Sequence, residues 1–291
     1  MDANNYTRKD FIKLLGLGTA SLAFSPWYMK DKAGYVAPIA FQLYSVRREI
    51  EKDFEKTIHK LADMGFEGVE TYALPANLTV PQAAKVFKEY GLKVISMHTE
   101  LPLGDQQEKI VQAAEAYHCD HVIYAGWPQG EKYKNLDAIK KTAETYHESA
   151  SFLKSKGIHF GLHNHWWEFE MVDGVYPFYY LLEHADPKIF FEIDTYWAKT
   201  SGQNPIKIVK DFGARAPFLH IKDGPAVKGT KSYEQLPVGT GVMDFKSIVK
   251  SGGNNTKWMI VEFDEYAGNI FEGMHSSYKY LTKNHLAKGK V

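Results

Sequence analysis

The chain has 291 residues, of which 44% are hydrophobic and 24% are charged, a balance typical of soluble globular proteins with a substantial core. Lys plus Arg and Asp plus Glu number 35 each, so no basic excess favours binding to nucleic acid or to an anionic membrane. The single cysteine, Cys119, excludes both an intrachain disulfide and a thiolate metal cluster.

The first 34 residues differ from the rest of the chain. Arg8 and Lys9 precede an uncharged, mostly apolar run, residues 14–26, which is typical of an export signal and is too short to span a bilayer. Residues 7–13, TRKDFIK, resemble a twin-arginine signal with Lys9 in place of the second arginine. An amphipathic helix packed on the body is the alternative. We expect residues 1–34 to be an export signal and linker, without a stable membrane anchor, and the protein to be exported, to the periplasm.

From residue 35 onwards, short apolar runs alternate with amphipathic segments of helical length. Residues 39–45 and 66–71 are predicted strands, and the segment between them is a predicted helix that ends at Gly65. Further strands are predicted over residues 92–98, 121–126, 158–165, 189–194, 216–223 and 257–263. Further helices are predicted over residues 81–91, 106–118, a long segment ending at Lys156, 177–185, 205–213 and 243–253. The pattern predicts eight strands and about eight helices in one domain, residues 35–291.

Strands that alternate with helices pair in parallel through right-handed crossovers, and eight such units in this length fit a closed (β/α)8 barrel. A doubly wound open sheet is the alternative. Such sheets usually carry a glycine-rich phosphate-binding turn after the first strand, whereas here the first strand leads into QLYSVRREIEKD, with no GxGxxG or GxxxxGK[ST] pattern. We therefore predict an α/β fold, a single-domain (β/α)8 TIM barrel, without a nucleotide site.

In such a barrel the active site lies at the carboxyl ends of the strands, and most of the predicted strands end in polar side chains. They are Gln42, Tyr44, Glu70, His98, Glu100, Tyr124, His163, His165, Asp194, His220, Lys222, Glu262 and Asp264. Residues two apart share a face of a strand, so pairs such as His163 and His165 can both point inward. A single histidine at a strand end is more often structural than a ligand, but the whole set is harder to explain in that way.

The last four strands supply two imidazoles and two carboxylates, a combination that suits one divalent ion such as Mn²⁺, Zn²⁺, Co²⁺ or Mg²⁺. These residues are His163, Asp194, His220 and Glu262. Buried ionisable groups need partners, and a metal ion would satisfy all four together.

The order and spacing of several short motifs resemble the xylose-isomerase-like (β/α)8 superfamily of sugar and sugar-phosphate isomerases and epimerases, with relatives that dehydrate inosose or dehydroshikimate. The resemblance covers residues 39–281 and rests on FQLYSVR, GFEGVE, GLKVISMH, GLHNHWWEFE, EIDTYWAKTSGQNP, FLHIKD, VGTGVMDF and IVEFDEY. It implies that a divalent metal is held by His163, Asp194, His220 and Glu262.

One position departs from the family pattern. Many of the isomerases and epimerases have a glutamate at the position of His163, and in the sugar epimerases that glutamate and the one matching Glu262 act as acid and base on opposite faces of the substrate. An imidazole at this position puts a simple two-glutamate epimerase in doubt. His165 or Glu168 could replace the missing group.

The resemblance implies metal-assisted enolisation of a carbohydrate carbonyl, with Glu262 or a neighbouring base such as His165 removing the α-proton. Lys222 and His98 are candidates for assisting the oxygen or the leaving group. Either could instead be structural, because Lys222 can pair with Asp194 or Asp223. Reprotonation on the next carbon would make the enzyme an isomerase, reprotonation on the other face an epimerase, and loss of a β-substituent a lyase or dehydratase, acting for example on a keto-sugar, an inosose or a 3-keto-glycoside. A hydrolase with such a substrate is part of the same alternative.

Aromatic side chains near the strand ends suit the apolar C–H faces of a sugar ring, although they could also seal the barrel mouth. Trp127, Trp166 and Trp197 are candidate substrate contacts, together with Gln42 and Glu70. An exported protein meets glycosides more often than sugar phosphates, and no phosphate-binding motif is evident, so a free or oxidised sugar is favoured.

Two other classes remain. A catalytically silent carbohydrate-binding barrel would keep the tryptophans, and a DNA-repair endonuclease of the same superfamily should carry more metal ligands and a basic face, which zero net charge disfavours. The expected partners are a small carbohydrate and, in a homodimer, a second copy of the chain.

Overall fold

The computed structural model describes residues 35–290, so the predicted export signal lies outside the described part of the chain. Eight strands form a closed barrel in chain order, and the last pairs with the first. All neighbouring strands are parallel. The predicted (β/α)8 barrel is thus confirmed, and the open-sheet alternative is excluded. Within residues 35–290, no helix combines the length and apolar character needed to cross a membrane.

Each predicted strand has a counterpart in the barrel. The strands are β1 (Ile39–Gln42), β2 (Gly68–Thr71), β3 (Lys93–Thr99), β4 (His121–Tyr124), β5 (His159–His163), β6 (Phe190–Asp194), β7 (Phe218–Ile221) and β8 (Trp258–Val261). The first strand ends earlier than predicted, because the chain turns into a 3₁₀ helix, η1 (Leu43–Val46). The side-chain oxygen of Gln42 accepts a hydrogen bond from the Tyr44 amide at 2.9 Å and so begins this turn.

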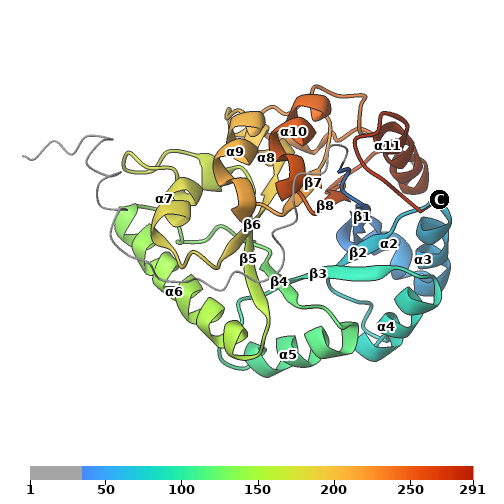
Figure 1. Ribbon diagram of the computed structural model, residues 1–291, viewed down its shortest axis with the longest axis horizontal. Coiled ribbons are helices and arrows are strands. Elements are labelled where there is room, and N and C mark those ends of the chain that lie inside the picture. Colours follow the sequence, from blue (N-terminus) through green and yellow to red (C-terminus); the bar gives the residue numbers. More distant parts are fainter. Residues whose placement is uncertain (1–34, 291) are drawn as a thin grey trace, which may run out of the picture. The chain divides into compact units, whose positions relative to one another are not determined.

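The helices form a ring outside the strands (Figure 1). They are α2 (Arg47–Ile50), α3 (Phe54–Asp63), α4 (Val80–Glu89), α5 (Gln106–Tyr117), α6 (Leu136–Ser155), α7 (Pro177–His184), α8 (Thr195–Thr200), α9 (Pro205–Phe212), α10 (Phe245–Gly252) and α11 (Ile270–Lys283). Asp or Asn side chains cap the first turns of α3, α6, α9, α10 and α11, which fixes where these helices begin. Helices α2, α8 and α11 add to the predicted ones.

The lower part of the barrel interior is apolar. It is filled by Ala40, Ile95, Ile123, Phe190, Phe218 and Ile260. Phe190 reaches across to β5, where a Cβ atom on Gly161 would lie 2.3 Å from its ring, so glycine is needed there for close packing. Because side chains two apart share a face, Glu192 and Asp194 follow Phe190 into the interior, above this apolar layer.

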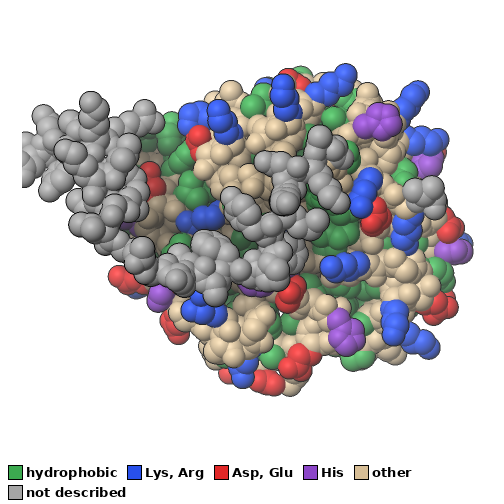
Figure 2. All heavy atoms as spheres, viewed as in Figure 1, with side chains coloured by type: hydrophobic (Ala, Val, Ile, Leu, Met, Phe, Trp, Pro, Cys, Tyr) green, Lys and Arg blue, Asp and Glu red, His purple; other side chains and the backbone are tan. Residues whose placement is uncertain are grey.

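Charged side chains of both signs are interspersed over the described surface in Figure 2, in keeping with the equal numbers of acidic and basic residues. A further group of charged side chains is buried inside the barrel, at the carboxyl ends of the strands.

Candidate metal centre and active site

Three of the four predicted metal ligands converge at the ends of β6, β7 and β8. Candidate ligand atoms of Asp194, His220 and Glu262 all lie within 4.8 Å of one another. Nδ1 of His220 is 2.6 Å from Oε2 of Glu262 and 3.9 Å from Oδ2 of Asp194. These three atoms are buried, and none makes a hydrogen bond of acceptable geometry within residues 35–290. Two carboxylate oxygens and one imidazole nitrogen that converge in this way are a donor set that fits a divalent ion.

Local structure leaves one oxygen of Asp194 available for such an ion. Its Oδ1 accepts a hydrogen bond from the Trp197 amide at 2.8 Å and caps α8, which begins directly after β6. Asn164 holds the Asp194 backbone on both sides, since its side chain accepts from the Asp194 amide and donates to the Asp194 carbonyl. Burial raises the pKa of Asp194 to about 6, although Lys222 and His220 lower it.

Lys222 is the cation that these carboxylates meet in the structure. Its Nζ lies 2.9 Å from Asp194, 2.8 Å from Glu262 and 2.7 Å from Asp264, and the side chain is almost completely buried. Burial alone would lower the pKa of Lys222, but the three carboxylates raise it well above its ordinary value. The sequence analysis named Asp194 and Asp223 as possible partners of Lys222, and the structure pairs Lys222 with Asp194.

Asp223, the other expected partner of Lys222, has a different role. Its carboxylate accepts hydrogen bonds from four backbone amides in the segment that follows β7, those of Gly224, Gly239, Gly241 and Met243. The segment, residues 224–243, contains η4 (Thr230–Tyr233) and is anchored at both ends by this one side chain.

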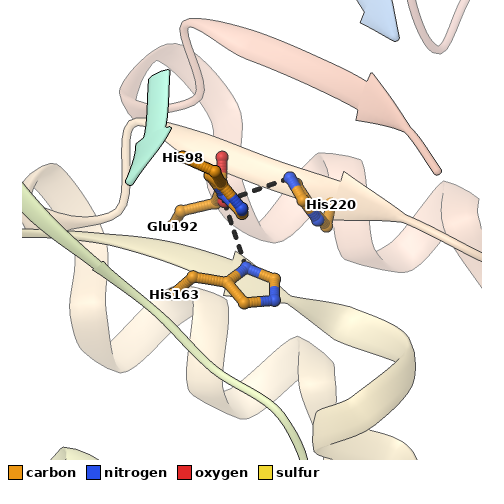
Figure 3. A group of neighbouring side chains, drawn as sticks. All are labelled: His98, His163, Glu192 and His220. Atoms are coloured by element: carbon orange, nitrogen blue, oxygen red, sulfur yellow. Dashed lines mark hydrogen bonds and ion pairs between the residues drawn. The ribbon is translucent and has the colours of Figure 1, made fainter. Parts of the chain in front are cut away.

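His163, the fourth predicted ligand, belongs to a neighbouring group with His98, Glu192 and His220 (Figure 3). Oε2 of Glu192 lies 2.6 Å from Nε2 of His98, 3.1 Å from Nδ1 of His163 and 3.0 Å from Nε2 of His220. Burial lowers the pKa of His163 to about 3, so its imidazole is neutral. The sequence analysis did not select Glu192, although it is two residues before Asp194 and thus on the same face of β6.

Gln42 and Glu70, predicted to contact substrate, lie fully buried in the polar layer of the barrel. Oε1 of Glu70 accepts hydrogen bonds from Gln42 at 2.8 Å and from Nε2 of His220 at 2.6 Å, while Ser96 donates to Oε2. The hydrogen bond between Glu70 and Nε2 of His220 fixes the orientation of the His220 ring and directs its Nδ1 toward Asp194 and Glu262. A histidine held in this way by a carboxylate is the arrangement found behind many metal ligands.

A cavity of about 600 Å³ opens at this end of the barrel. Among the predicted catalytic residues, His98, His165 and Glu262 line it, and the cavity wall also includes His163, Trp127 and Trp197. Tyr44, which the sequence analysis placed at a strand end, also lines the cavity, as do Tyr72, Tyr117 and Tyr233, which it did not select. The cavity has the size and mixed character of a small-molecule site.

The three tryptophans differ in their position. Trp127 is 55% exposed and Trp197 is 1% exposed, so the first stands at the rim and the second in the wall. Trp166 packs against Trp197 and Trp167, with ring centroids 5.0 and 4.6 Å apart, and is not among the lining residues.

His165 and Glu168 follow β5. The ring of His165 stacks on Trp167 with 4.4 Å between centroids, and its Nδ1 is buried without a hydrogen bond within residues 35–290. Burial lowers the pKa of His165 well below its ordinary value. Glu168 is fully buried and accepts a hydrogen bond from the His165 amide at 2.8 Å; burial raises its pKa to about 8. Glu168 thus holds the backbone that presents His165.

These features define the class: a parallel (β/α)8 barrel with buried imidazoles and carboxylates gathered around a cavity at the strand ends. A family model described as xylose isomerase-like TIM barrel matches residues 58–277, and the chain belongs to this family. The predicted resemblance is therefore confirmed. No match is found among curated proteins.

Solved structures share the fold at low sequence identity. A sugar phosphate isomerase/epimerase from Parabacteroides distasonis has a TM-score of 0.71 and 24% identity, over 89% of this chain and 98% of that one. A D-allulose 3-epimerase from Methylomonas sp. has a TM-score of 0.64 and 16% identity, over 85% and 98% of the two chains. The IOLI protein, whose structure contains a bound zinc atom, has a TM-score of 0.68 and 12% identity, over 86% and 98%.

Proposed function

We propose that the protein is a divalent-metal-dependent enzyme that isomerises or epimerises a carbohydrate through an enediolate. The observation that carries the proposal is the convergence of three buried candidate ligand atoms, on Asp194, His220 and Glu262, within 4.8 Å of one another. A divalent ion held there would polarise a carbonyl or hydroxyl oxygen of the sugar. His163, predicted as the fourth ligand, lies in the neighbouring group.

The chain's own residues supply acid–base chemistry beside this point. Burial opposes ionisation of Glu262, but Lys222 and His220 hold its pKa well below the ordinary value, so the carboxylate is charged. It lines the cavity and is the proposed base for the α-proton. The Lys222 ammonium, 2.8 Å from Glu262, would stabilise negative charge that develops on a sugar oxygen.

The cavity wall supports a carbohydrate as substrate. Trp127 offers an aromatic face to the C–H surface of a sugar, Trp197 forms part of the wall, and imidazoles and carboxylates line the same space. Together with export to the periplasm, which we also propose, this favours a free or oxidised sugar over a sugar phosphate.

A lyase that expels a β-substituent from a keto-sugar or a 3-keto-glycoside is the second candidate. The imidazole of His163 at a position where many relatives carry glutamate favours it, because elimination needs one base and an acid rather than two carboxylates on opposite faces. His98 lines the cavity and is a candidate acid.

The test combines metal analysis with hydrogen exchange. Purified protein is loaded with Mn²⁺, Co²⁺ or Zn²⁺, bound metal is quantified, and ketosugars and 3-keto-glycosides are incubated with it in D₂O. Deuterium at the carbon next to the carbonyl, detected by NMR and lost in Glu262→Gln, is the expected result. Isomer, epimer or elimination products then separate the candidates. Asp211→Asn, a surface carboxylate on α9 that pairs with Lys207, is the control.

Bound metal without exchange or turnover of any substrate would overturn the enzymatic proposal and favour a carbohydrate-binding barrel. Protein that takes up no divalent ion under metal-replete conditions would overturn the mechanism itself.

A further inference from the structure

The buried charges of the barrel exceed what one ion and one lysine can offset. Five carboxylates make ion pairs inside the barrel, those of Glu70, Glu192, Asp194, Glu262 and Asp264, and Lys222 pairs with the last three. Glu192 is fully buried, and no Lys or Arg within residues 35–290 pairs with it. A buried carboxylate requires a compensating cation or a full set of hydrogen-bond donors.

Imidazole nitrogens are the polar atoms that surround Glu192. Nε2 of His98, on β3, and Nδ1 of His163, on β5, both point at the same carboxylate oxygen, at 2.6 and 3.1 Å (Figure 3). The other oxygen, Oε1, is buried and makes no hydrogen bond within the described residues. Two imidazoles aimed at one oxygen, beside an unsatisfied partner oxygen, form a preassembled set of nitrogen and oxygen ligands.

We propose that His98, His163 and Glu192 form a second divalent-cation site, separate from that of Asp194, His220 and Glu262. His220 stands between the two sites. Its Nε2–H is donated to Glu70 at 2.6 Å, which leaves Nδ1 for the first site and leaves the second site to the other two histidines. The second site does not depend on the reaction proposed above.

The two sites differ in the ions that they favour. Two imidazoles and one carboxylate suit Zn²⁺, Co²⁺ or Fe²⁺, whereas a site with two carboxylates and one imidazole also accepts harder ions such as Mn²⁺ and Mg²⁺. Three protein ligands leave a coordination position open, as in catalytic rather than structural zinc sites. His98 and His163 both line the cavity, so a small molecule in the cavity can reach that position.

The charges also balance with two ions. Two divalent cations together with Lys222 carry five positive charges, which equals the charge of these five carboxylates when all are ionised. With one divalent ion the remaining negative charge would have to be offset by protons on imidazoles or carboxylates.

The test measures the number of bound ions in the full-length protein. Metal-free protein is titrated with Zn²⁺ and, separately, with Co²⁺; bound metal is quantified after removal of excess, and the visible absorption of Co²⁺ is recorded. We expect two equivalents in the wild type, one in Glu192→Gln and in His98→Gln, and one in Asp194→Asn, which keeps the second site. Glu168→Gln changes another buried carboxyl group, outside both sites, and should keep two equivalents. Circular dichroism checks the fold of each variant.

A single equivalent in the wild type would overturn the second site. Two equivalents retained by folded His98→Gln would also overturn it, and this variant serves if Glu192→Gln does not fold. Loss of metal only in Asp194→Asn would reject the second site and leave the proposed function intact. Loss of one metal equivalent in Glu192→Gln and in His98→Gln, without any turnover in the wild type, would support the second site and overturn the proposed function.

Discussion

Nε2 of His220 on β7 donates a hydrogen bond to Oε1 of Glu70 on β2, 2.6 Å away and 150 positions apart in the chain. The contact runs across the inside of the barrel and determines that Nδ1 is the ring nitrogen available for a metal ion. Carboxylates that hold a metal-binding histidine in this way also raise its basicity as a ligand.

Replacing Glu70 by Gln should therefore weaken metal binding without removing a ligand. The amide keeps the shape of the side chain but loses the charge that polarises His220, so we expect about a ten- to hundredfold weaker affinity for divalent ions. Competition with a chromogenic chelator measures it. Glu168→Gln is the matched control and should bind as the wild type does; equal affinities for Glu70→Gln and wild type would show that the contact has no influence on the site.

Lys222→Met should destabilise the metal-free protein. The substitution leaves Asp194, Glu262 and Asp264 close together without the ammonium that lies 2.7 to 2.9 Å from each, and breaking a buried ion pair on one side costs about 3–5 kcal/mol. Divalent ions should restore much of this loss, because they offset the same charges. Urea unfolding with and without metal gives both numbers, and an unchanged midpoint in the metal-free variant would contradict the expectation.

Glu168 should make stability depend on pH between about 4.5 and 8. Its pKa rises from 4.5 to about 8 on folding, because it is buried, so the folded state binds more protons than the unfolded state in this range. The stability that Glu168 contributes is complete below pH 4.5 and is lost as pH rises through 8, by about 5 kcal/mol at most. Glu168→Gln should flatten the decline of the melting temperature from pH 5 to 8; parallel curves for the two proteins would refute this assignment.

Trp127 and Trp197 should separate substrate binding from stability. Trp127→Ala removes a side chain that is 55% exposed and should change the free energy of unfolding by no more than about 0.5 kcal/mol, while weakening binding of a sugar about three- to tenfold. Trp197→Ala creates a cavity in the wall and should cost about 3–5 kcal/mol. Thermal melts and calorimetric titration with a ligand sugar report the two effects, and the reverse pattern would remove Trp127 from the proposed binding site.

Gly161→Ala should strain the apolar layer beneath the site. The new methyl group would lie 2.3 Å from the Phe190 ring, and overpacking of this kind costs about 1–3 kcal/mol. Phe190→Leu in the same chain should recover part of the loss, because the smaller side chain makes room. Additive losses in the double variant would mean that the two positions do not compete for the same space.

The sequence predicted the barrel well because each strand is a short apolar run between helical segments, and its length leaves little choice of architecture. It also predicted that Asp194, His220 and Glu262 would approach one another, since parallel strands in a closed barrel end at one rim. These expectations depend only on local pattern and on the direction of the strands.

The parts that local pattern could not predict depend on register and side-chain direction. Glu192 lies within an apolar run, and only the alternation along β6 places it beside Asp194. Gln42 and Glu70 were predicted to contact substrate, yet inside the barrel Gln42 donates a hydrogen bond to Glu70, and Glu70 accepts one from His220. Trp166 follows His165 directly, but the turn after β5 directs it against Trp197 and away from the cavity.

Asp223 binds the amides at both ends of the segment over residues 224–243, and Tyr233 within that segment lines the cavity. When one carboxylate holds both ends of a loop through hydrogen bonds, the residues between those ends can change in number and type at small entropic cost. Mutations there would remodel one wall of the cavity while the histidines and carboxylates on the strands stay in place. The barrel therefore contains a segment through which descendants of this protein could acquire new substrates without rebuilding their metal chemistry.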